Sequence, residues 1–132
     1  MQLAAASFKV SRWDEEPYHE FDSGAKITQA KVTQNYQGAI SGEGTVEYLM
    51  TYTSHGTASF VGMELVVGSV NEKSGSFVIQ HKGVFENGKA KSEWSIVEGA
   101  GTGELSGLCG SGRYEVGHEE AEVECQFNFV DN

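Results

Sequence analysis

Apolar and polar residues alternate along most of the chain, in short runs that glycine, asparagine and serine separate. A two-residue period is typical of β-strands with one buried face. The pattern predicts strands over residues 5–13, 25–37, 44–53, 57–70, 75–86, 89–97, 103–110 and 121–130. No long helix is expected, because no segment repeats its apolar residues with a helical period, and only a single turn near 14–17 is allowed.

Eight strands are the smallest number common in closed barrels. The sequence therefore predicts an all-β fold, a single antiparallel closed barrel of about eight strands. The length of 132 residues is that of one domain, so we expect one β-barrel domain over residues 1–132.

Loop lengths fix the register of hairpins, and register decides which side chains share a face. The predicted loops have two residues at 87–88, four at 71–74 and three at 54–56. They place His81 opposite Trp94, Glu64 opposite His81, and Tyr48 opposite Gly62. All three registers agree on one face, which we interpret as the barrel interior: Val46, Tyr48, Met50, Tyr52, Phe60, Glu64, Val66, Phe77, Ile79, His81, Trp94 and Ile96.

Glu64 and His81 are the strongest candidates for a site, because a carboxylate and an imidazole inside an apolar barrel can act as a base and an acid. The ligand-binding residues we predict are Tyr48, Tyr52, Glu64, His81 and Trp94. The alternative is structural: the pair satisfies its own hydrogen bonds and those of nearby tyrosines in a filled core.

Three functions remain open on these residues. The first is a barrel that binds a small, largely apolar molecule. The second is an isomerase or cyclase without a cofactor, in which Glu64 and His81 serve as general base and acid. The third is a structural protein that forms homo-oligomers without a ligand.

The opposite face of residues 57–70 carries Val61, Met63, Leu65 and Val67, which are poorly suited to water. Large exposed apolar patches mark contacts. We expect this face to be covered, either by residues 1–6 or by a second copy of the chain in a homodimer.

Charge and composition narrow the partners. The net charge is −10, from 9 basic and 19 acidic residues, so we expect no binding to nucleic acid or to anionic membranes. Only Cys109 and Cys125 are present, and we expect two reduced thiols, the alternative being a disulfide bridge if the chain is exported. The first residues do not resemble a secretory signal. We therefore predict a cytoplasmic protein. No metal site or cofactor is expected, because His19, His55 and His118 stand at no ligand spacing.

Several motifs stand in order along the chain: Phe8, Ser11-Arg12-Trp13-Asp14-Glu15, Gly42-Glu43-Gly44-Thr45, Phe60-Val61-Gly62-Met63-Glu64, Gly75-Ser76-Phe77-Val78, Gln80-His81 and Gly101-Thr102-Gly103-Glu104-Leu105-Ser106-Gly107-Leu108. Together they resemble those of a family of uncharacterised bacterial proteins, known only as a domain of unknown function. The resemblance spans nearly the whole chain. It implies an eight-stranded barrel of the allene oxide cyclase type, similar in shape to the calycins, and no assigned activity.

Overall fold

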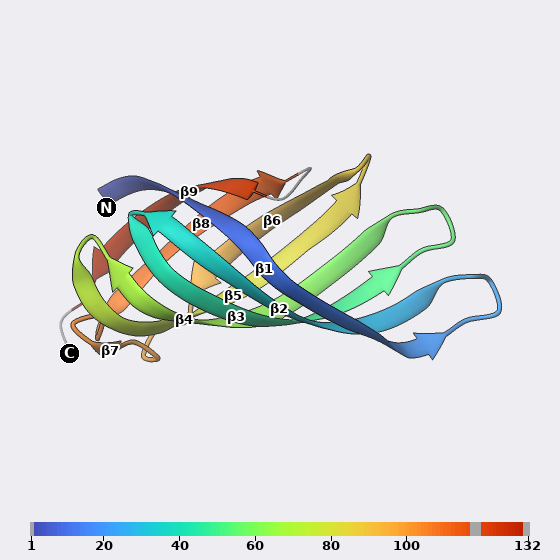
Figure 1. The fold of residues 1–132 in the computed structure, drawn as a ribbon, viewed down its shortest axis with the longest axis horizontal. Helices are drawn as coiled ribbons and strands as arrows, with labels where there is room; N and C mark the ends of the chain where they lie inside the picture. Colours follow the sequence, from blue (N-terminus) through green and yellow to red (C-terminus); the bar gives the residue numbers. More distant parts are fainter. Residues whose placement is uncertain (1, 117–119, 131–132) are drawn as a thin grey trace.

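The described part of the chain, residues 2–116 and 120–130 of a computed structural model, is built from antiparallel strands (Figure 1). The strands are β1 (Gln2–Glu20), β2 (Lys26–Gly38), β3 (Ile40–Tyr52), β4 (Ala58–Val70), β5 (Lys73–Glu86), β6 (Lys89–Ile96), β7 (Thr102–Gly103), β8 (Leu108–Val116) and β9 (Glu120–Phe129). Within these residues, no helix is long and apolar enough to cross a membrane.

Eight of the strands form a closed ring. Their order is β4-β3-β2-β1-β9-β8-β6-β5, and pairing between β4 and β5 closes it. The two-residue strand β7 pairs with β5 at one end of the ring. The prediction of an all-β antiparallel fold with about eight ring strands is confirmed, and the arrangement is barrel-like.

Strand β1 is longer than predicted. The single helical turn that the sequence allows near 14–17 is not formed, because β1 continues to Glu20 through irregularities after Val10 and Pro17. Pro17 lacks an N–H group and is tolerated in a strand only at an edge. It meets this condition because β1 pairs with β9 only up to Lys9 and with β2 beyond that point.

The strand predicted over 103–110 is also wrong in its extent. The chain makes a turn over residues 104–107, and β8 starts only at Leu108. In this turn Leu105 is fully buried among the apolar residues at that end of the ring. A buried apolar residue between two glycines gives the same sequence pattern as a short strand between turns, which is why a strand was predicted here.

Two of the three predicted registers are confirmed, since His81 pairs with Trp94 and Tyr48 pairs with Gly62. The third is off by two residues. The loop has only Asn71 and Glu72, both with positive φ, so His81 pairs with Gly62. Side chains alternate with period two, and a shift of two residues keeps each on its predicted face.

The predicted inner face is buried, except for Tyr52, which is half-buried. The predicted outer face is exposed. Residues 2–6 do not cover it, because they belong to β1 and pair with β9 in the ring. The prediction that residues 1–6 cover this face is therefore wrong for residues 2–6, and Met1 lies outside the described residues.

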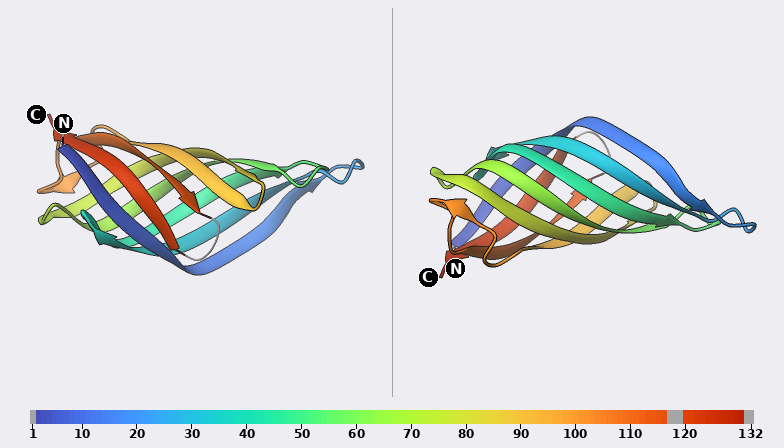
Figure 2. Two further views of the ribbon diagram at one scale, coloured as in Figure 1. Left: turned by 90° about the horizontal axis from the view of Figure 1, so that it is seen from above. Right: turned by 90° about the horizontal axis from the view of Figure 1, so that it is seen from below.

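The two ends of the ring differ. Figures 1 and 2 show the chain ends and β7 at one end, while the hairpins β1–β2 and β3–β4 project past the other strands at the opposite end. An apolar cluster with Ile40, Phe77 and Leu105 fills the first end. We call the second end the staggered end.

Candidate functional site

Glu64 and His81 meet inside the ring. The distance from His81 Nε2 to Glu64 Oε1 is 2.6 Å, and the side chains are 1% and 0% exposed. They come from the neighbouring strands β4 and β5 and stand diagonally across the pair, because Glu64 itself pairs with Ile79. The predicted meeting of the two side chains is present in the structure, although the predicted direct opposition is not.

Strand β2 supplies two further partners of Glu64. The Gln34 amide donates to Glu64 Oε2 at 2.9 Å, and the Tyr36 hydroxyl lies 2.9 Å from both carboxylate oxygens. Burial, and then the negative potential of Glu64, raise the pKa of Tyr36 well above its ordinary value. Tyr36 therefore remains a hydrogen-bond donor to the carboxylate.

These two residues were missed at the level of sequence. Gln34 and Tyr36 share the parity of Ala30 and Val32, which are buried on the same strand. Extending that alternation to the end of β2 places both polar side chains inside the ring. The signal was present in the strand predicted over 25–37.

Gly44 makes room for the Glu64 carboxylate. A Cβ atom at this position would lie 2.0 Å from Glu64 Oε2. A Cβ at Gly62 would similarly lie 2.6 Å from Tyr48 Cδ1. Both glycines are thus required by close approach of a large side chain to the backbone.

Ser92 orients the other side of the imidazole. Its Oγ lies 3.4 Å from His81 Nδ1, so Glu64, His81 and Ser92 follow one another in a line of polar contacts. Ser92 is only 3% exposed, and its hydroxyl also donates to the Glu93 carbonyl. It is placed to position His81.

Aromatic rings lead from the network toward solvent. The Tyr48 and Tyr114 hydroxyls are 3.2 Å apart, and both rings pack against His81 with centroids 5.7 and 6.1 Å away. Burial raises the pKa of both tyrosines. Trp13 stacks on Tyr48 at 6.3 Å and is 46% exposed. The indole is therefore the solvent-facing member of this series.

A second polar cluster lies at the staggered end. Glu15 accepts hydrogen bonds from Thr28, Tyr52 and Trp13 at 2.6, 2.7 and 2.9 Å. Desolvation raises the pKa of Glu15, but these bonds and Lys26 together outweigh it, so the net shift is downward. Desolvation and Glu15 raise the pKa of Tyr52 to about 12. Lys26 Nζ lies 5.0 Å above the Tyr52 ring.

The predicted site residues thus divide into two groups. Tyr48 packs beside the Glu64–His81 pair, whereas Tyr52 belongs to the cluster around Glu15. Trp94 is buried opposite His81, and its ring lies against Gly112. A ligand-binding role for these residues stays a prediction.

Residues 4–129 match the model of a family described as a protein of unknown function, DUF3224. The chain belongs to this family. A solved structure of a DUF3224 protein of unknown function from Shewanella oneidensis MR-1 is 25% identical to this chain, with a TM-score of 0.81. The match covers 99% of this chain and 100% of that one. No curated protein matches significantly. The predicted membership of an uncharacterised family is confirmed.

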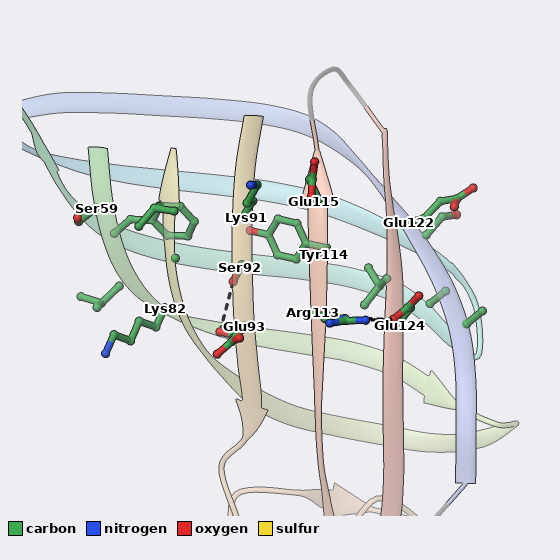
Figure 3. A pocket seen from close by; sticks show the side chains of 18 of the residues that line it. Ser59, Lys82, Lys91, Ser92, Glu93, Arg113, Tyr114, Glu115, Glu122 and Glu124 are labelled. Carbon is green, nitrogen blue, oxygen red and sulfur yellow. Dashed lines mark hydrogen bonds and ion pairs between the residues drawn. The ribbon is translucent and has the colours of Figure 1, made fainter. Parts of the chain in front are cut away.

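This DUF3224 chain has an open hollow of about 1730 Å³ whose lining residues come from all eight strands of the ring (Figure 3). Most of its lining residues are outward-facing and exposed, such as Lys82, Glu93 and Arg113. Neither Glu64 nor His81 lines it. Ser92 and Tyr114, which pair across β6 and β8, are its links to the buried network.

The network is complete without further groups. No buried side-chain nitrogen or oxygen in the described residues lacks a hydrogen-bond partner. Among the same residues, no three His, Cys, Asp or Glu side chains are placed to hold a metal ion, and His118 lies outside them. The arrangement therefore contains a carboxylate and an imidazole in contact and shielded from water. Gln34 and Tyr36 hold the carboxylate, and Ser92 lies beside the imidazole.

Proposed function

We propose that this DUF3224 protein binds a small, flat, largely apolar molecule at the staggered end of the ring. The observation that carries the proposal is the ring series from Trp13 through Tyr48 to His81. An aromatic side chain that faces inward yet stays half-exposed offers a stacking surface at low cost in desolvation.

The polar end of the proposed site is the hydroxyl pair of Tyr48 and Tyr114. Both hydroxyls stay protonated because burial raises their pKa, and since one of them donates to the other, the second can donate to a carbonyl or ether oxygen of a ligand. Glu64 and His81 lie behind this pair and fix its surroundings. The ligand class that fits is an uncharged aromatic or cyclic molecule with one polar oxygen.

Binding can be tested by recording ¹H–¹⁵N spectra of the protein with a library of uncharged aromatic fragments. We expect shift changes at the indole N–H of Trp13 and at neighbouring amides of β1 and β3. Trp13→Ala should abolish them, whereas Phe129→Ala, an exposed aromatic residue at the other end, should not. Changes confined to the outer hollow, or none at all, would overturn the proposal.

A second candidate function is cofactor-independent acid–base catalysis, which the 2.6 Å contact of Glu64 with His81 favours. Glu64→Gln keeps the shape of the side chain and removes the base. A fragment that binds and is converted should still bind this variant without being converted. Equal loss of binding and conversion would leave only the binding function.

We also propose a cytoplasmic location. Cys109 and Cys125 are both free thiols, and burial raises the pKa of Cys125 to about 11. Two unpaired thiols fit a reducing compartment. Fractionation of cells that produce the tagged protein would test the location.

A further inference from the structure

The outer face of β4 is an exposed apolar strip. Val61, Met63, Leu65 and Val67 are 51%, 53%, 49% and 57% exposed, and all point away from the ring interior. Leu49, which pairs with Val61 on β3, extends the strip and is 50% exposed. Contiguous apolar surface of this kind is unfavourable in water and marks a contact.

Charges of opposite sign flank the two sides of the strip. On the β3 side, Glu47 pairs with Met63, and Glu43 pairs with Val67. On the β5 side, Lys82 pairs with Val61. The strip therefore has two carboxylates along its β3 side and one lysine, Lys82, along its β5 side.

We propose that a second copy of this chain covers the strip, in a two-fold symmetric dimer whose β4 strands lie face to face and run in the same direction. Two-fold symmetry about an axis along β4 places β3 of each copy over β5 of the other. Glu47, level with Met63, then lies over β5 of the partner subunit, two residues along the strand from Lys82 of the partner subunit, which is level with Val61, and this approach occurs twice.

The opposite orientation is disfavoured by the same charges. If the two β4 strands ran in opposite directions, β3 would lie over β3 of the partner subunit, and the acidic borders would face each other. Like charges across an interface reduce affinity and act against the wrong arrangement. The charges beside the strip thus favour the parallel arrangement over the antiparallel one.

The surface relief agrees with a face-to-face contact. Val61 borders the large outer hollow, and Val67 borders a second one of about 740 Å³. The strip is thus hollowed at both ends, where side chains of the other copy can enter. An interface with an apolar centre and a charged rim has the composition of stable homodimers.

The first test is the mass of the protein in solution by light scattering over a range of concentrations. We expect a dimer for the wild type and a monomer for Met63→Asp. Val130→Asp is the matched control, because Val130 is 45% exposed and follows β9, which lies across the ring from β4. A monomeric wild type, or a dimer that survives Met63→Asp, would overturn the proposal and leave the strip to a different partner.

The second test addresses the direction of packing. Glu47→Lys and Lys82→Glu should each raise the dimer dissociation constant by about tenfold, because two contacts change from attraction to repulsion. The double variant should restore the wild-type value. Single variants that dimerise like the wild type, or a double variant weaker than both, would overturn the parallel arrangement. Circular dichroism of each variant checks that the fold is intact.

Discussion

Glu64 and Glu15 both accept a hydrogen bond from a tyrosine hydroxyl, yet they lie in opposite surroundings. Glu64 is fully buried and touches His81, whereas Glu15 is half-buried at the staggered end. Water can replace a lost partner of Glu15 but cannot reach the partners of Glu64. The difference shows that a glutamate–tyrosine contact needs every hydrogen bond to be kept inside the ring, whereas at the rim water can replace a lost one.

The largest effect is expected from removing the buried carboxylate, with removal of the one at the rim as the comparison. Glu64→Ala should lower the free energy of unfolding by about 3–5 kcal/mol, because it leaves His81 and Tyr36 buried without their partner. Glu15→Ala should cost no more than about 1 kcal/mol, because water solvates the groups it leaves. Denaturant unfolding of both variants measures the difference. Equal losses would contradict the contrast between the two sites.

A smaller effect is expected from filling the space beneath the buried carboxylate. Gly44→Ala places a methyl group 2.0 Å from Glu64 Oε2, so the side chain must move or the strand must shift. We expect a loss of about 1–3 kcal/mol in the free energy of unfolding. Glu43→Ala, at the outward-facing neighbouring position, is the control and should be near neutral. A stable Gly44→Ala variant would show that the network tolerates displacement.

The smallest effect concerns the rim and appears only at alkaline pH. The pKa of Tyr52 is about 12 in the folded protein and 10.0 in its ordinary state, so the folded state retains the proton longer. Its stabilising contribution is complete below pH 10 and is lost as pH rises toward 12. The difference in unfolding free energy between wild type and Tyr52→Phe should therefore shrink over this range. A constant difference would contradict the Glu15–Tyr52 contact.

The inner face of the ring could be predicted because side chains along a strand alternate between its two faces with a period of two residues. The loop at 71–72 was predicted two residues too long, since its second residue, Glu72, adopts a positive φ that usually indicates glycine. The error left Glu64 and His81 on the same face, and their side chains still meet. An error of one residue would have turned one of them outward.

The course of β1 could not be predicted in the same way. Before the irregularity after Val10, even-numbered residues such as Phe8 face the interior of the ring. Beyond it, odd-numbered residues such as Trp13 and Glu15 do. A bulge depends on pairing with a distant strand, and no local pattern of apolar residues records it. The Glu15 cluster was missed for this reason, although Trp13 and Glu15 stand within a motif that resembles the family.

The pairing of β1 with β9 constrains the order of synthesis and folding. Strand β1 pairs with β9, so the ring cannot close until residues near Phe129 have left the ribosome. Until then β1 and β8 present unpaired edges, which are the parts of a sheet most prone to aggregate. We therefore expect chains of this protein that lack β9 to aggregate more readily than the complete ring.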